Sequence, residues 1–165
     1  MKNNLTIEDL YEKFSIYAFR MIAKKRYTEH EIEKKLKARG ADNGICQRII
    51  ERLKELDYLD DRKFARDYID YRVKASPRGR FLISRELRNK GINKDLLNTV
   101  LDETPVNELE LAKQLVEKKN GKISKLPLIK QKSKMYQFLT SKGFTRETVY
   151  KAIELCYNPG ANQDQ

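Results

Sequence analysis

The sequence predicts an all-α protein made of three tandem three-helix repeats that form an elongated helical array. Two observations lead to this prediction. A segment that ends in a cation followed by glycine occurs three times, at Gly40, Gly91 and Gly143. Apolar residues lie four positions apart on both sides of each glycine, and no segment alternates strictly between apolar and polar residues as a half-buried strand does. The pattern is typical of helix pairs joined at a C-terminal glycine cap.

A recurring dipeptide locates the first helix of each repeat. The pairs Tyr17-Ala18, Phe64-Ala65 and Leu111-Ala112 are separated by 47 residues, twice in succession. Apolar residues follow three and four positions later, which continues a helical stripe. The predicted helices, in chain order, cover residues 7–25, 28–39 and 43–56, then 61–74, 78–90 and 94–103, and then 107–120, 128–142 and 146–156.

Capping residues mark the starts of several of these helices. Thr28 and Glu31 have the spacing of a capping box. Ser76 followed by Pro77 predicts a cap residue and a first helical turn, where proline costs no hydrogen bond. Asn107 and Thr145 are weaker signals of the same kind.

One three-helix unit buries little apolar surface by itself, so the units are expected to stack on one another. The predicted repeats cover residues 1–58, 59–104 and 105–157, and a flexible C-terminal tail covers 158–165.

Composition excludes several classes of protein. The chain has 165 residues, of which 36% are charged, and its net charge is +11. Such an excess favours polyanionic partners. There is neither a signal-peptide core at the start nor an apolar run of about 18 residues that could span a bilayer, so we expect a soluble cytoplasmic protein with no membrane partner. Cys46 and Cys156 form no CxxC pair and are expected to be buried thiols in a reducing cytoplasm.

Catalytic and metal-binding patterns are weak. His30 is the single histidine and lies between two glutamates at a helix start, which is typical of a solvated surface position. The pair Asp60-Asp61 opens a predicted helix, where acidic residues offset the helix dipole. No glycine-rich phosphate loop is present. We therefore expect no enzymatic activity, no metal and no cofactor.

Cations cluster at the same place in each repeat. Residues 20–40, 72–94 and 113–134 each contain eight Lys or Arg, against three, one and one acidic residues. Any single cation is well explained as a solvated helix face, but the threefold recurrence favours a periodic anionic partner such as DNA or a protein filament. Most aromatic residues fall in the apolar stripe and are expected in the core. Tyr27, Tyr71 and Phe81 border the basic segments and are candidate contacts.

Several segments resemble the RecX family. The most specific is LDYLDDRKFARDY at 56–68, and RELRNKGI at 85–92, the segment 18–37 and FLTSKGF at 138–144 add to it. The resemblance implies three tandem three-helix repeats that form an elongated, curved helical array, and a regulator that binds the RecA–single-stranded DNA filament. It implies inhibition of recombination, ATP hydrolysis and co-protease activity, and so a limit on the SOS response. The loop at 76–79 departs from the arrangement of many family members.

The candidate RecA- or DNA-binding residues follow from the charge map alone. Their expected role is charge-assisted bonding to phosphates or carboxylates. The partners expected are the RecA filament, single-stranded DNA and, non-specifically, double-stranded DNA, for a chain that is a monomer. The candidates are Arg72, Lys74, Arg78, Arg80, Arg85 and Arg88, extended by Lys24, Lys25 and Arg26 in the first repeat and by Lys118 and Lys119 in the third.

Two other functions remain open from the residues. A helix-turn-helix transcription regulator could form its turns at Gly40 and Gly91, but such a protein needs one distinctive recognition helix, whereas here similar helices recur. Selective binding to particular duplex sites would favour it. An inert helical scaffold leaves the basic excess unexplained.

Overall fold

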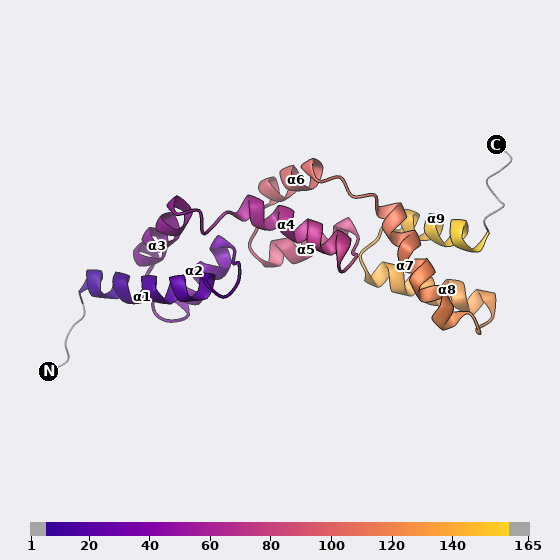
Figure 1. Ribbon diagram of the computed structural model, residues 1–165, viewed down its shortest axis with the longest axis horizontal. Helices are drawn as coiled ribbons and strands as arrows, with labels where there is room; N and C mark the ends of the chain where they lie inside the picture. Colours follow the sequence, from indigo (N-terminus) through magenta and orange to yellow (C-terminus); the bar gives the residue numbers. More distant parts are fainter. Residues whose placement is uncertain (1–5, 159–165) are drawn as a thin grey trace. The chain divides into compact units, whose positions relative to one another are not determined.

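The computed structural model describes residues 6–158, and these form nine helices and no strand (Figure 1). The all-α prediction is confirmed. The predicted C-terminal tail lies outside the described residues except for its first residue. The helices are α1 (Ile7–Ile22), α2 (Glu29–Lys37), α3 (Asn43–Glu55), α4 (Asp61–Lys74), α5 (Arg80–Asn89), α6 (Lys94–Glu103), α7 (Glu108–Ile123), α8 (Leu128–Ser141) and α9 (Arg146–Tyr157).

Glycine ends the second helix of each group of three. Gly40, Gly91 and Gly143 have φ angles of 92°, 89° and 84°, the left-handed region that glycine adopts without strain. The amide of the residue after each glycine donates to the carbonyl five positions earlier, at 3.1, 3.1 and 3.4 Å. The predicted glycine caps are therefore confirmed at all three positions.

The N-terminal caps agree with the sequence in all but one case. The Thr28 hydroxyl accepts from the Glu31 amide at 3.2 Å, and Glu31 accepts from the Thr28 amide at 3.2 Å, which confirms the capping box. Asn107 and Thr145 cap α7 and α9. The predicted start at Ser76-Pro77 is wrong, because α5 begins only at Arg80.

Two further helix ends differ from the prediction by three residues, and the others by at most two. The first helix stops at Ile22 instead of residue 25, and α7 runs on to Ile123 through Gly121. Burial accounts for the longer α7, because the Ile123 side chain belongs to the core and holds the last turn in place.

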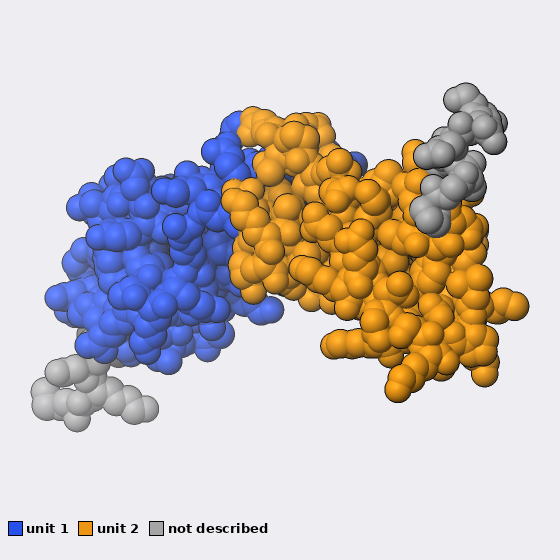
Figure 2. Space-filling view, turned by 45° about the vertical axis from the view of Figure 1, so that its right-hand side comes forward, with its two compact units in different colours: residues 1–67, 87–100 blue, residues 68–86, 101–165 orange. Residues whose placement is uncertain are grey.

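Packing divides the chain into two compact units (Figure 2). The first contains the described residues through Asp67 together with Leu87–Val100, and the second contains Tyr68–Glu86 and the residues from Leu101 onward. The boundaries therefore fall inside α4, α5 and α6.

Each unit has its own apolar core. In the first, α1, α2 and α3 pack on one another around Leu36, Ile49 and Leu53, which are at most 1% exposed. In the second, α7, α8 and α9 surround Met135 and Leu139, both fully buried. Burying one such side chain stabilises the fold by about 2 kcal/mol. No helix among the described residues is both long and apolar enough to cross a membrane.

One contact occurs twice and is called here the junction contact. In the first unit, the Glu29 amide at the start of α2 donates to Asp61 Oδ1 at 3.0 Å, and the Thr28 hydroxyl donates to the Lys90 carbonyl at 2.5 Å. Lys90 is the residue just before Gly91, so the start of α2 lies against the turn that ends α5.

The second unit repeats this arrangement with other residues. The Arg80 amide at the start of α5 donates to Glu108 Oε1 at 2.7 Å, and the Gly79 amide donates to the Lys142 carbonyl at 2.9 Å. Asp61 and Glu108 are 47 residues apart, the period of the repeat. In both cases a carboxylate at the start of one repeat's first helix accepts a hydrogen bond from the amide at the start of the preceding repeat's second helix. That amide would otherwise have no partner.

We expect Asp61→Asn to leave the chain at least as stable as the natural chain at pH 7, and Asp61→Ala to cost about 1 kcal/mol. Burial raises the pKa of Asp61 above its ordinary value of 3.8, although the bond from the Glu29 amide opposes the rise. Asparagine keeps an acceptor oxygen for that amide and removes the charge that burial disfavours. Alanine leaves the amide without its partner.

The pH dependence follows from the same shift. The folded chain holds the Asp61 proton more tightly than the unfolded chain does. Protonation of Asp61 therefore stabilises the folded chain below the ordinary pKa of Asp61, and this contribution is lost as pH rises through the raised pKa. Thermal unfolding of both variants at pH 7 and pH 4 measures this. Relative to Asp61→Asn, the natural chain should gain stability at the lower pH. Equal losses of stability in the two variants would contradict the assignment of Asp61 as the acceptor for the Glu29 amide.

Candidate anion-binding surface

A cluster around Glu86 lies at the centre of the most basic segment. Arg72 Nε is 2.9 Å from Glu86 Oε2, and Arg78 Nε is 3.3 Å from Glu86 Oε1. The Tyr68 hydroxyl donates to Glu86 at 2.9 Å and accepts from Arg72 Nη2 at 2.7 Å. The side chains of Arg72, Arg78 and Glu86 are only 17%, 24% and 21% exposed. Burial raises the pKa of the Tyr68 phenol, so this hydroxyl stays protonated at neutral pH.

The loop between α4 and α5 is held by short contacts on its other side. Arg80 Nη2 is 2.8 Å from Asp102 Oδ1, in addition to the bond from its amide to Glu108. A Cβ added at Gly79 would overlap the Gly143 carbonyl and lie 2.5 Å from the Phe144 nitrogen. Glycine is therefore required here by close backbone approach, which also explains why the helix does not begin at Ser76.

The structure separates the predicted contact residues of this region into two kinds. Arg72, Arg78 and Arg80 have internal acidic partners and hold the loop. Lys74 and Arg85 are exposed and form no ion pair within the part of the chain that the structure describes. Tyr71 and Phe81, the aromatic candidates, are 55% and 62% exposed. Phe81 and Arg85 are four residues apart on α5 and therefore share a face.

The predicted cations of the first unit are divided in the same way. Arg26 is exposed but forms an ion pair with Asp67, whereas Lys24 and Arg88 are exposed and form no ion pair among the described residues. Lys25 Nζ lies 4.6 Å from the centre of the Tyr27 ring, a cation–π contact that leaves the charge at the surface.

The predicted cations of α7 lie beside an aromatic ring of α8. Lys119 Nζ is 3.7 Å from the centre of the Phe138 ring, and Lys118 is exposed. Lys119, Phe138 and Lys134 border an open pocket of about 460 Å³. Lys134 belongs to the basic segment at 113–134, but it was not among the predicted contact residues.

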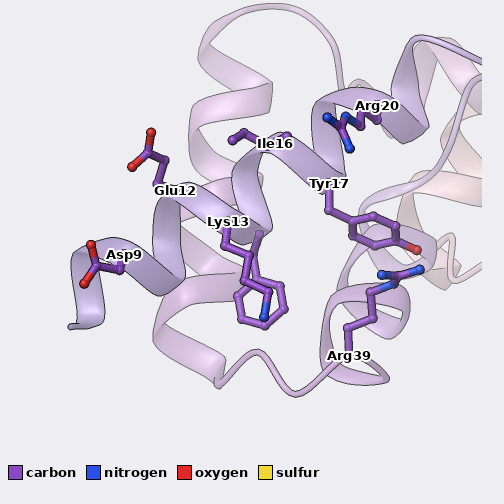
Figure 3. Close-up of a pocket in the computed structure, with 8 residues that line it drawn as sticks. Asp9, Glu12, Lys13, Ile16, Tyr17, Arg20 and Arg39 are labelled. Atoms are coloured by element: carbon purple, nitrogen blue, oxygen red, sulfur yellow. The ribbon is translucent and has the colours of Figure 1, made fainter. Parts of the chain in front are cut away.

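A larger groove on the first unit contains residues that sequence reasoning missed. Its volume is about 590 Å³, and Lys13, Tyr17, Arg20 and Arg39 are among the residues that line it (Figure 3). The Arg39 guanidinium lies 4.0 Å from the centre of the Tyr17 ring. The signal that could have identified the groove is the cation before each glycine, which is Arg39 in the first repeat.

The described residues offer little for covalent or metal chemistry. No group of three or more His, Cys, Asp or Glu among them could hold a metal ion. Cys46 is buried, as predicted, and Cys156 is half-buried. Burial raises the pKa of both thiols, so neither forms a thiolate readily at neutral pH.

Three groups of three helices with exposed cations define the chain as a helical-repeat protein with a basic surface. Three family models match it in order: the first RecX three-helix domain at residues 16–53, the second at 60–101 and the third at 107–153. The chain belongs to the RecX family, whose curated members are named regulatory proteins.

Relatives and solved structures agree with the family models. The chain is 30% identical to the regulatory protein RecX of Chlorobaculum tepidum, over 84% of this chain and 85% of the relative. It is 31% identical to that of Halorhodospira halophila, over 82% and 83%. The crystal structure of RecX from Lactobacillus salivarius matches the fold with a TM-score of 0.79 at 23% identity, covering 92% of this chain and 99% of that one. A second RecX crystal structure has a TM-score of 0.77 at 28% identity, covering 89% and 74%.

Proposed function

We propose that this chain binds the RecA–single-stranded DNA filament and inhibits its recombinase, ATPase and co-protease activities, which limits recombination and the SOS response. Membership of the RecX family is the observation that carries the proposal. In this proposal the chain acts as a cytoplasmic monomer, and it inhibits by binding rather than by catalysis.

The exposed cations supply the means of binding. A filament that carries DNA presents phosphates, and each neutralised phosphate releases a counterion and adds to affinity. Lys74 and Arg85 are free to make such contacts, whereas Arg72, Arg78 and Arg80 are engaged with acidic residues of this chain. In the proposal, the paired arginines hold the loop in shape and the exposed cations contact the filament.

We expect the double variant Lys74→Glu/Arg85→Glu to bind the filament at least about tenfold more weakly, because two attractive contacts become repulsive. The measurement is surface plasmon resonance on immobilised RecA–single-stranded DNA filaments at fixed salt concentration. A matched control is Arg146→Glu/Lys151→Glu, which makes the same charge change at exposed positions of α9 outside the basic segments.

The control should bind within about twofold of the natural chain if position, and not net charge, decides affinity. Equal loss in both variants would contradict the assignment of Lys74 and Arg85. Selective binding of the natural chain to particular duplex sites, without affinity for the filament, would instead support a helix-turn-helix regulator.

A further inference from the structure

The groove beside Arg39 corresponds to the surface that forms the junction contact in the other two repeats. Phe14 lies 47 residues before Asp61, and Asp61 lies 47 before Glu108. Asp61 and Glu108 each accept a hydrogen bond from the amide that opens a preceding second helix. Among the described residues, no second helix precedes α1, so none of them forms this contact with the first repeat.

The glycine turn of the first repeat is accordingly open. A Cβ added at Gly40 would meet nothing within 4 Å among the described residues, whereas one at Gly91 would overlap His30 and one at Gly143 would overlap Leu82. The turns have the same backbone conformation, with φ between 84° and 92°. The first repeat thus presents a docking surface that residues 6–158 leave open.

At two equivalent positions, the charge of this surface is opposite to that of the next repeat. Lys13 and Arg20 stand 47 residues before Asp60 and Asp67, of which Asp67 binds Arg26. Phe14 replaces the carboxylate that binds the helix amide. A helix N-terminus docked as in the junction contact, including one from a second copy of this chain, would therefore find no carboxylate at the position of Asp61 and would bring its positive dipole end towards Lys13, Arg20 and Arg39.

The Arg39 guanidinium lies over the Tyr17 ring, 4.0 Å from its centre. Neither Arg39 nor Arg20 forms an ion pair within the described chain. A guanidinium that lies over an aromatic ring keeps its N–H edges available for a bidentate carboxylate or phosphate. Its side chain also loses less conformational freedom on binding than a side chain that is free in solvent.

Two carboxylates on the same groove favour a protein over a nucleic acid. Asp9 and Glu12 line its other end, towards the start of α1 (Figure 3). Hydrogen bonds from Thr6 hold the pKa of Asp9 below its ordinary value, so Asp9 is charged at neutral pH. A continuous polyphosphate laid along the groove would be repelled at that end, whereas a peptide can carry acidic residues at one end only.

We infer that the groove lined by Tyr17, Arg20 and Arg39 binds an acidic segment of a partner protein, whose carboxylates pair with the two arginines. The inference deepens the proposed function, since such a segment on a filament subunit would fix the position of the first repeat. It is independent of DNA contacts made by the other basic residues.

The test uses the full-length variant Arg20→Glu/Arg39→Glu and the control Arg146→Glu/Lys151→Glu. Two fluorescein-labelled probes of equal length are titrated and followed by anisotropy: a peptide with glutamates at one end and glycine and serine at the other, and an oligothymidylate. Circular dichroism checks that helicity is unchanged. We expect peptide affinity to fall at least about tenfold in the groove variant and oligothymidylate affinity to change by less than about twofold. The control variant should retain its affinity for both probes.

Three results would overturn the inference: no change in peptide affinity, an equal fall for both probes, or an equal fall in the control. An equal fall for both probes in the groove variant alone would indicate a phosphate site. Because the peptide assay contains no RecA, its outcome does not depend on whether the chain binds the filament. Arg39→Lys, which keeps the charge but loses the planar fork, should bind the peptide with intermediate affinity.

Discussion

Alanine at Gly143 is expected to lower the free energy of unfolding by about 3 kcal/mol or more, and alanine at Gly40 by only about 1–2 kcal/mol. Both glycines have left-handed φ angles, so a side chain costs the same backbone strain at each. At Gly143 the added Cβ would also overlap Leu82 Cβ and lie 2.8 Å from the Leu82 nitrogen, whereas at Gly40 nothing is near. Leu82 is buried and cannot easily move away.

Urea or thermal unfolding of the two variants measures the difference, and Gly40→Ala is the matched control. The difference between the losses of unfolding free energy in Gly143→Ala and Gly40→Ala measures the contribution of the junction contact. Gly91→Ala, where the added Cβ would overlap His30, should also exceed Gly40→Ala. Equal losses at Gly40 and Gly143 would show that the start of α5 does not pack on this turn in solution.

Removing the Glu86 carboxylate is expected to cost about 2–4 kcal/mol, because Arg72 and Arg78 would then be two partly buried cations without a counter-charge. Glu86→Ala also removes the acceptor for the Tyr68 hydroxyl. Glu86→Gln keeps an acceptor of the same size and should lose less. Thermal unfolding of both variants provides the measurement.

Glu117→Ala is the matched control, since Glu117 is an exposed glutamate on α7 and its replacement should change stability by less than about 0.5 kcal/mol. A loss at Glu86 no larger than at Glu117 would mean that the cluster does not hold the loop. The binding experiment on Lys74 and Arg85 would then lose its structural basis.

Local signals in the sequence predicted the helices well. The glycines at positions with left-handed φ, the capping box at Thr28 and the stripe around Leu36 each depend on residues within one or two turns, so they can be read from spacing alone. The start of α5 could not be predicted in this way. Gly79 bonds to the carbonyl of Lys142, which is 63 positions away, and this contact competes with the local signal of Ser76-Pro77.

The candidate site could be predicted only as a set of cations. Sequence spacing indicates which segments are basic, but it does not show that Arg72 and Arg78 share Glu86 or that Arg26 pairs with Asp67. Those pairings depend on how segments distant in sequence pack together. The groove at Arg39 was missed for a related reason, because its open turn is recognised only by comparison with the occupied turns at Gly91 and Gly143.

The most direct test of the proposed function is DNA-dependent ATP hydrolysis by RecA from the same organism on single-stranded DNA. The chain is titrated at concentrations well below that of RecA, with Lys74→Glu/Arg85→Glu in parallel. We expect strong inhibition by the natural chain at substoichiometric concentration and weaker inhibition by the variant. Full ATP hydrolysis at equimolar natural chain, with binding to bare DNA retained, would contradict the proposal and indicate an independent DNA-binding protein.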